Sequence, residues 1–129
     1  KAAGAKLVRK LVVSGAFHSP LMSSAADQLQ KALATADIQS PRVPVMSNVT
    51  GKPHGEANDI RAKLYDQLLS PVRWTECMET MNGMSPTRWF ELGPGNVLAG
   101  LLKRSISGAS AQTVGTVTEL VSVLQGATA

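Results

Sequence analysis

The sequence predicts an α/β fold, because short apolar runs alternate with helical patterns along its 129 residues. Strands are predicted over residues 11–14, 43–47, 88–92 and 113–117. Helices are predicted over residues 19–36, 59–69, 74–81, 96–106 and 118–124. Alternation of this kind is typical of a largely parallel sheet with helices on its faces.

The start and stop signals of the helices support these boundaries. Ser19 is a suitable N-cap, and Pro20 stands at the first helical position, which proline favours. Thr75 is a candidate cap for the helix that follows Pro71. Residues 50–58 contain two glycines and a proline, so we expect them to form a loop.

The two ends of the chain carry separate expectations. Residues 1–8 are good helix formers and look like the last turns of a helix, so we expect the chain to be part of a longer protein. Residues 123–129 look like a frayed natural terminus.

The composition favours an ordinary globular domain. Hydrophobic residues make up 43% of the chain and charged residues 17%. The formal net charge is +4, yet the 13 Lys and Arg are scattered and only 4% of the residues are aromatic. A nucleic-acid surface is therefore not predicted. A docking surface for a small acidic partner fits the modest positive charge better.

Cysteine and histidine usage limits the chemistry further. Cys77 is the only cysteine, which excludes an internal disulfide and favours a reducing compartment. His18 and His54 are the only histidines, and no metal site is predicted. His54 lies in a polar loop, where we expect it to be solvated. No apolar run has the length of a membrane span, so no membrane association is predicted.

His18 is the strongest candidate for chemistry. It stands between the predicted strand at residues 11–14 and the helix that follows, and ligands in open α/β sheets bind at the carboxyl ends of strands. The alternative is a structural histidine beside Phe17. A histidine base needs a nucleophile. The closest serine pattern, residues 108–112, lacks the last glycine of the GxSxG elbow.

Gly93 and Gly95 follow a predicted strand and precede a helix. The dinucleotide pattern GxGxxG fails because Leu98 stands where its last glycine is required. The two glycines are therefore interpreted as a tight turn. The helix N-terminus beside them remains able to present backbone amides to an active site.

Four ordered motifs resemble one enzyme family. They are SGAFHSPLM at residues 14–22, VPVMSNVTG at 43–51, QLLSPVRW at 67–74 and FELGPGNVLAGLLKR at 90–104. In this order and spacing they resemble the C-terminal part of malonyl-CoA:acyl-carrier-protein transacylases, and of the acyltransferase domains of polyketide and fatty-acid synthases. The resemblance covers essentially the whole chain.

The resemblance implies an α/β-hydrolase-like core of which this chain is the C-terminal part. Residues 1–14 would be the end of a small ferredoxin-like subdomain, otherwise missing here, and the return strand. Residues 15–129 would belong to the acyltransferase core. The family's serine nucleophile and its carboxylate-binding arginine would both lie upstream of this sequence. No bound cofactor is implied, since coenzyme A and phosphopantetheine are carried by the substrates.

The resemblance also assigns roles to residues. His18 would be the general base that activates the serine and later the incoming thiol. Gln67 would hold the histidine ring through its backbone carbonyl. Phe17 would favour malonyl over methylmalonyl by crowding an α-methyl group. Asn48 would lie near the substrate, with its role open.

The partners implied are acyl carrier protein, malonyl-CoA and the N-terminal remainder of the enzyme. Lys103 and Arg104 would face the acidic carrier protein, although cations also suit the end of a helix. Two alternatives stay open: a non-catalytic module that binds carrier protein, and a piece of a synthase acyltransferase domain. A bacterial cytoplasm, a plastid stroma and a mitochondrial matrix all fit the sequence.

Overall fold

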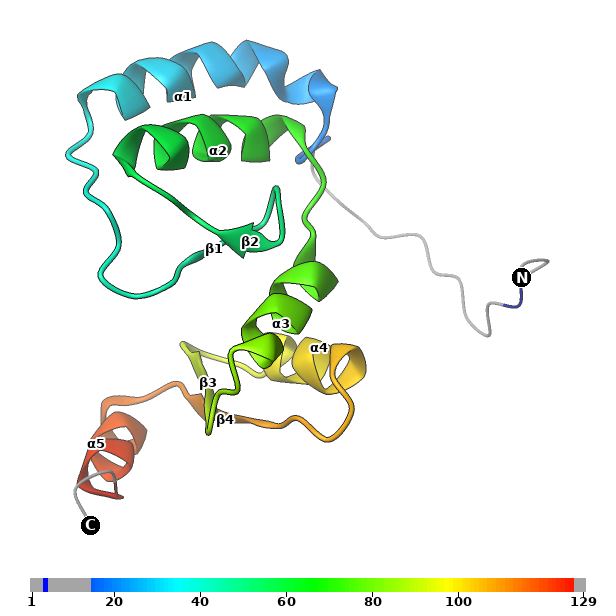
Figure 1. Ribbon diagram of the computed structural model, residues 1–129, viewed down its shortest axis with the longest axis vertical. Helices are drawn as coiled ribbons and strands as arrows, with labels where there is room; N and C mark the ends of the chain where they lie inside the picture. The colour runs from blue at the N-terminus through cyan, green and yellow to red at the C-terminus, as the bar shows by residue number, and fades with distance from the viewer. Residues whose placement is uncertain (1–3, 5–14, 127–129) are drawn as a thin grey trace.

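The structure is a computed structural model that describes Gly4 and residues 15–126. The predicted strand at residues 11–14 lies outside the described residues, as do the predicted helical turns at 1–8 apart from Gly4. The other residues mix helices with small sheets, which confirms the α/β class. They form two groups of elements that differ in architecture (Figure 1).

The first group consists of two helices over a short hairpin. A 3₁₀ turn, η1 (Pro20–Met22), leads into α1 (Ser23–Thr35), which packs along α2 (Ala57–Leu69). Ser19 caps η1 through an N–H bond from Leu21, and Pro20 follows it, so both predictions are confirmed. The hairpin pairs β1 (Met46–Ser47) antiparallel with β2 (Lys52–Pro53).

This hairpin corrects two expectations. Residues 43–45 were expected to extend the strand, but Pro44 lacks an N–H and the side chains of Val43 and Val45 are exposed. Residues 50–58 were expected to be a loop, but they contain β2 and the start of α2.

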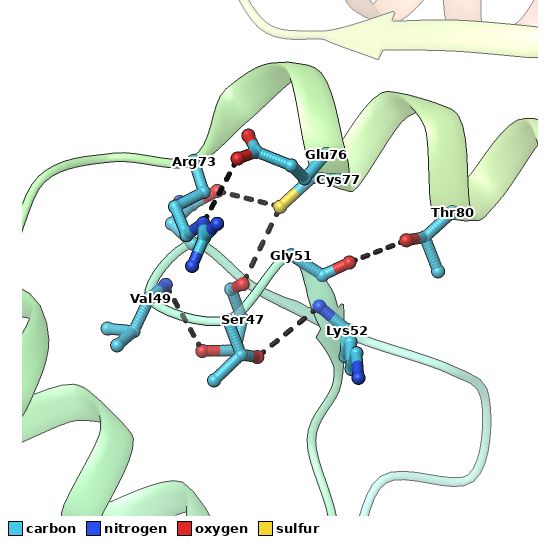
Figure 2. A network of polar contacts seen from close by, with 10 residues as sticks. Ser47, Val49, Gly51, Lys52, Arg73, Glu76, Cys77 and Thr80 are labelled. Atoms are coloured by element: carbon cyan, nitrogen blue, oxygen red, sulfur yellow. Dashed lines mark hydrogen bonds and ion pairs between the residues drawn. The ribbon is translucent and has the colours of Figure 1, made fainter.

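The turn of the hairpin lies against α3 (Trp74–Gly83). Gly51 has a φ of 67°, and a Cβ there would lie 2.5 Å from Glu76 Cβ, so only glycine fits this approach. Thr80 Oγ1 donates a hydrogen bond of 2.6 Å to the Gly51 carbonyl (Figure 2). The expected Thr75 cap is wrong, because α3 begins at Trp74 with Arg73 as its N-cap.

The second group holds the core. β3 (Trp89–Leu92) pairs in parallel with β4 (Ala111–Val114). α4 (Val97–Ser105) packs against both strands, and α3 packs against α4. Cys77, Met78 and Leu102 are buried between these elements. The described residues thus form two two-stranded sheets, of which only one is parallel, and not one larger parallel sheet.

The C-terminal elements begin earlier than predicted. β4 starts at Ala111. α5 (Val117–Gly126) starts at Val117, because Thr116 and Glu119 form a capping box there. Thr116 N donates to Glu119 Oε2 at 2.9 Å, and Glu119 N donates to Thr116 Oγ1 at 3.2 Å.

Candidate active site

His18 lies on the turn that leads into η1. Its φ of 61° is in the left-handed region, which few residues other than glycine adopt. A hydrogen bond closes this turn, since Ser19 Oγ donates to the Ala16 carbonyl at 2.7 Å. The His18 side chain is exposed, and backbone strain of this kind is often found at functional sites.

A backbone carbonyl from α2 holds the His18 ring. His18 Nδ1 lies 2.8 Å from the carbonyl oxygen of Gln67, although the two residues are 49 positions apart. A carbonyl oxygen only accepts, so this hydrogen bond places the ring proton on Nδ1. Nε2 of the neutral ring then keeps its lone pair and can take a proton from another group.

The side chain of Gln67 supports the same arrangement. Its Nε2 lies 3.3 Å from His18 Nδ1 but donates at 3.1 Å to the Ser70 carbonyl. The carbonyl contact at Nδ1 is shorter than the amide contact, and a carbonyl can only accept, so it sets the tautomer. A hydrogen-bonded chain therefore runs from His18 through Gln67 to the segment after α2.

Asn48 lies directly after β1 and is anchored twice. Its carbonyl accepts a 2.8 Å hydrogen bond from Arg73 N, and its Oδ1 accepts from Cys77 Sγ at 3.4 Å. Cys77 Sγ also lies 3.6 Å from the Ser47 carbonyl (Figure 2). Burial raises the pKa of the Cys77 thiol, and Glu76 raises it further, so the thiol stays a protonated donor.

The other residues implied by the resemblance are exposed. Phe17 precedes His18 and is 59% exposed. Lys103 and Arg104 lie in the last turn of α4, which belongs to the second group of elements. Among the described residues no hydrogen bond or ion pair joins Lys103 or Arg104 to His18. The structure therefore brings His18 and Gln67 into contact. It shows no contact between these two residues and the side chains of Lys103 and Arg104 in the part of the chain that it describes.

The N-terminus of α4, whose amides the sequence left able to face an active site, is occupied by a side chain of the protein itself. The carboxylate of Glu91 accepts hydrogen bonds from Leu98 N at 3.0 Å and Ala99 N at 2.7 Å. Glu91 is buried, so no outside anion reaches these donors. Gly93 and Gly95 both have a positive φ. They let the chain turn after β3, so that the first turn of α4 meets the carboxylate of Glu91 on that strand.

His54 is also different from the expectation. It was expected to be solvated, but it is partly buried and its Nδ1 has no hydrogen-bond partner among the described residues. Burial lowers the pKa of His54, and the nearby Lys63 lowers it further, while Asp59 opposes them. A protonated ring is therefore disfavoured here.

Two kinds of feature are missing from residues 15–126. No cluster of three or more histidine, cysteine, aspartate or glutamate side chains could hold a metal ion there. No helix in this part of the chain is both long enough and apolar enough to cross a membrane.

Comparison with known proteins gives one consistent answer. No family model matches the chain. It is 46% identical over 101 residues to the malonyl CoA-acyl carrier protein transacylase of Bacillus subtilis, which covers 78% of this chain and 32% of that protein. It also matches the structure of the Coxiella burnetii malonyl CoA-acyl carrier protein transacylase with a TM-score of 0.87 and 38% identity.

A third match is the structure of a malonyl transacylase in complex with a type II polyketide acyl carrier protein. Its TM-score is 0.86 and its identity 40%, over 97% of this chain and 40% of that one. By their names, these relatives are acyl-group transferases. The chain belongs to the malonyl-CoA:acyl-carrier-protein transacylase family and spans between 32% and 40% of the length of these three relatives.

Proposed function

We propose that the protein carrying this sequence transfers malonyl from malonyl-CoA to the phosphopantetheine thiol of acyl carrier protein. The transfer runs through a serine ester, with His18 as the general base. The serine nucleophile and the carboxylate-binding arginine lie in the N-terminal remainder of the enzyme. The observation that supports this proposal is the 2.8 Å contact between His18 Nδ1 and the Gln67 carbonyl.

The proton balance follows from this contact. Nε2 of the neutral ring takes the serine proton as the serine oxygen attacks the malonyl thioester, and the protonated ring gives that proton to the leaving thiolate of coenzyme A. In the second half, Nε2 takes the proton of the carrier thiol, which attacks the malonyl ester, and returns it to the serine. The Gln67 carbonyl stabilises the charged ring in both halves without adding a second charge.

Phe17 and Asn48 are assigned to substrate binding. Phe17 stands beside the base, where its ring would crowd an α-methyl group and so favour malonyl, a discrimination of about 1–3 kcal/mol for one methyl group. Asn48 is held by Arg73 and Cys77 at the end of β1, which gives its amide a fixed place near the substrate.

We further propose that residues 15–129 are the C-terminal part of an α/β-hydrolase-like core, and that a small ferredoxin-like subdomain precedes them. Exposed apolar side chains support the first part. Leu92 on β3, Val97 on α4 and Val117 on α5 are each at least 69% exposed. Side chains of this kind need cover from further strands and helices.

Acyl carrier protein is the proposed protein partner. Lys103 and Arg104 present two exposed cations at the end of α4, which suits an acidic surface. A structural relative was solved with its acyl carrier protein bound, which supports the same class of partner.

The test is a malonyl-transfer assay on the full-length protein that carries this sequence. Replacing His18→Ala should lower kcat by about 10² to 10⁴-fold, the usual contribution of a general base, with imidazole in the buffer restoring part of the rate. Gln67→Ala keeps the backbone carbonyl and should cost far less. His54→Ala is the matched control.

A His18→Ala rate equal to that of the unchanged protein would refute the role of His18. Binding of acyl carrier protein without any transfer by the unchanged protein would favour the non-catalytic module instead. Transfer by the isolated protein with no synthase attached would favour a discrete enzyme over a synthase domain.

A further inference from the structure

One pocket of the described residues has no role in the chemistry above. It has a volume of about 500 Å³ and lies where the segment after α2 meets the turn after β1 and the start of α3. It is lined by Val49, Ser70, Pro71, Val72, Arg73 and Glu76. Its volume falls in the range of small-molecule sites.

A hydrogen-bonded chain links this pocket to the histidine. Ser70 forms one wall, and its carbonyl accepts the Gln67 amide. The Gln67 carbonyl in turn holds the His18 ring. On the opposite side, Val49 follows Asn48, whose carbonyl accepts from Arg73 N. A molecule in this pocket therefore lies beside the residues that hold His18 and Asn48.

Arg73 supplies the charge of the pocket. Its Nε donates to Glu76 Oε1 at 3.1 Å, which fixes one edge of the guanidinium group. Among the described residues, Nη1 and Nη2 have no hydrogen-bond partner, so the end of the fork is available. Two parallel N–H donors at that end fit two oxygens of a phosphate. Figure 2 shows the Arg73 side chain on the same side of the network as Val49.

The remaining walls are of a different character. Val49, Pro71 and Val72 give the pocket an apolar side, and Val72 is 43% exposed. A ligand with an apolar segment beside a phosphate suits these walls. The Glu76 carboxylate disfavours an anion at its own edge, which leaves the outer end of the Arg73 fork as the place for the phosphate.

We infer that this pocket binds the phosphate end of a phosphopantetheine arm, with Arg73 on the phosphate and the valines and proline on the dimethyl carbons beside it. The inference rests on the proposed function for the identity of the ligand. Coenzyme A and the carrier protein both present this chemistry, so either substrate could fill the pocket in its own half of the reaction.

The experiment compares Arg73→Ala with the unchanged full-length protein. It measures KM for malonyl-CoA, KM for acyl carrier protein, and KM for malonyl-N-acetylcysteamine, which carries no phosphate. Arg73→Ala should raise KM for at least one phosphate-bearing substrate by about tenfold and leave KM for the truncated thioester unchanged. Arg73→Lys should recover only part of the loss, because it lacks the fork.

Each pattern has a defined meaning. A rise for malonyl-CoA alone identifies coenzyme A as the ligand, and a rise for acyl carrier protein alone identifies the carrier arm. No rise for either, or an equal rise for the truncated thioester, overturns the inference. Arg42→Ala, which removes an exposed arginine from the loop between α1 and β1, is the matched control.

A binding measurement separates this inference from the proposed function. Calorimetric titration with coenzyme A, and separately with acyl carrier protein that carries its phosphopantetheine arm, reads the pocket without turnover. If the unchanged protein transfers no malonyl, the proposed function fails, and a tenfold weaker affinity of Arg73→Ala for either ligand still supports the pocket. Equal affinity of the two proteins for both ligands overturns it.

Discussion

Two segments that lead into helices each hold a polar side chain: His18 on the turn before η1, and Glu91 in β3, the strand before α4. The Glu91 carboxylate is buried and accepts from two backbone N–H groups of α4. The His18 ring is exposed and has one nitrogen held by the Gln67 carbonyl. The Glu91 carboxylate uses its hydrogen-bonding capacity within the fold, whereas the His18 ring keeps a lone pair for another molecule.

Residue type alone does not tell which of these two side chains stabilises the fold and which is available for chemistry. Both side chains are polar, and each lies within a few residues of a glycine in the sequence. The two side chains differ in their hydrogen bonds: the described part of the folded chain supplies donors to both oxygens of Glu91 but a partner to only one ring nitrogen of His18. The account therefore predicts that changes at Glu91 act on stability, and that changes at His18 act on turnover.

The largest expected effect on stability is at Glu91. Glu91→Gln turns an amide N–H₂ toward backbone donors, so the protein should lose about 2–4 kcal/mol of its free energy of unfolding. Glu119→Gln, at the exposed cap of α5, should have a smaller effect. Urea unfolding of both variants measures the difference. Equal losses would show that burial of the Glu91 cap is not what matters.

A smaller effect is expected from the backbone of His18. Its positive φ favours glycine, so His18→Gly should be more stable than His18→Ala by about 1 kcal/mol. Both variants lack the imidazole and should be equally slow in malonyl transfer. The check is the difference between their urea midpoints. A more stable alanine variant would contradict the left-handed conformation of this turn.

The smallest effect concerns pH and His54. Its pKa in the folded protein lies below the ordinary value of 6.5, so the unfolded chain binds more protons as the solution becomes acidic. The free energy of unfolding should therefore fall as pH drops below about 6.5. His54→Gln should flatten this fall. Identical pH profiles for the two proteins would mean that His54 is solvated after all.

Local signals in the sequence predicted local structure well. Ser19 and Pro20 determine the start of a helical segment through atoms within a few residues, and both lie where they were expected. The start of α5 has the same kind of signal, since Thr116 and Glu119 are spaced as a capping box. The predicted boundary missed it by one residue.

Long-range contacts could not be predicted from residue types. The acceptor for His18 is a backbone carbonyl 49 residues away, which every residue possesses, so only family resemblance pointed to Gln67. The Glu91 cap on α4 depends on how two glycines turn the chain, and it carries no spacing signature. The β1–β2 hairpin was missed because its strands are two residues long.

The most direct test of the central claim is the position of the proton on the His18 ring. Nitrogen NMR of the full-length protein distinguishes the two tautomers of the neutral ring. The account predicts a proton on Nδ1, donated to the Gln67 carbonyl, and a bare Nε2. A proton on Nε2 would leave His18 without a lone pair directed toward substrate and would contradict its role as the general base.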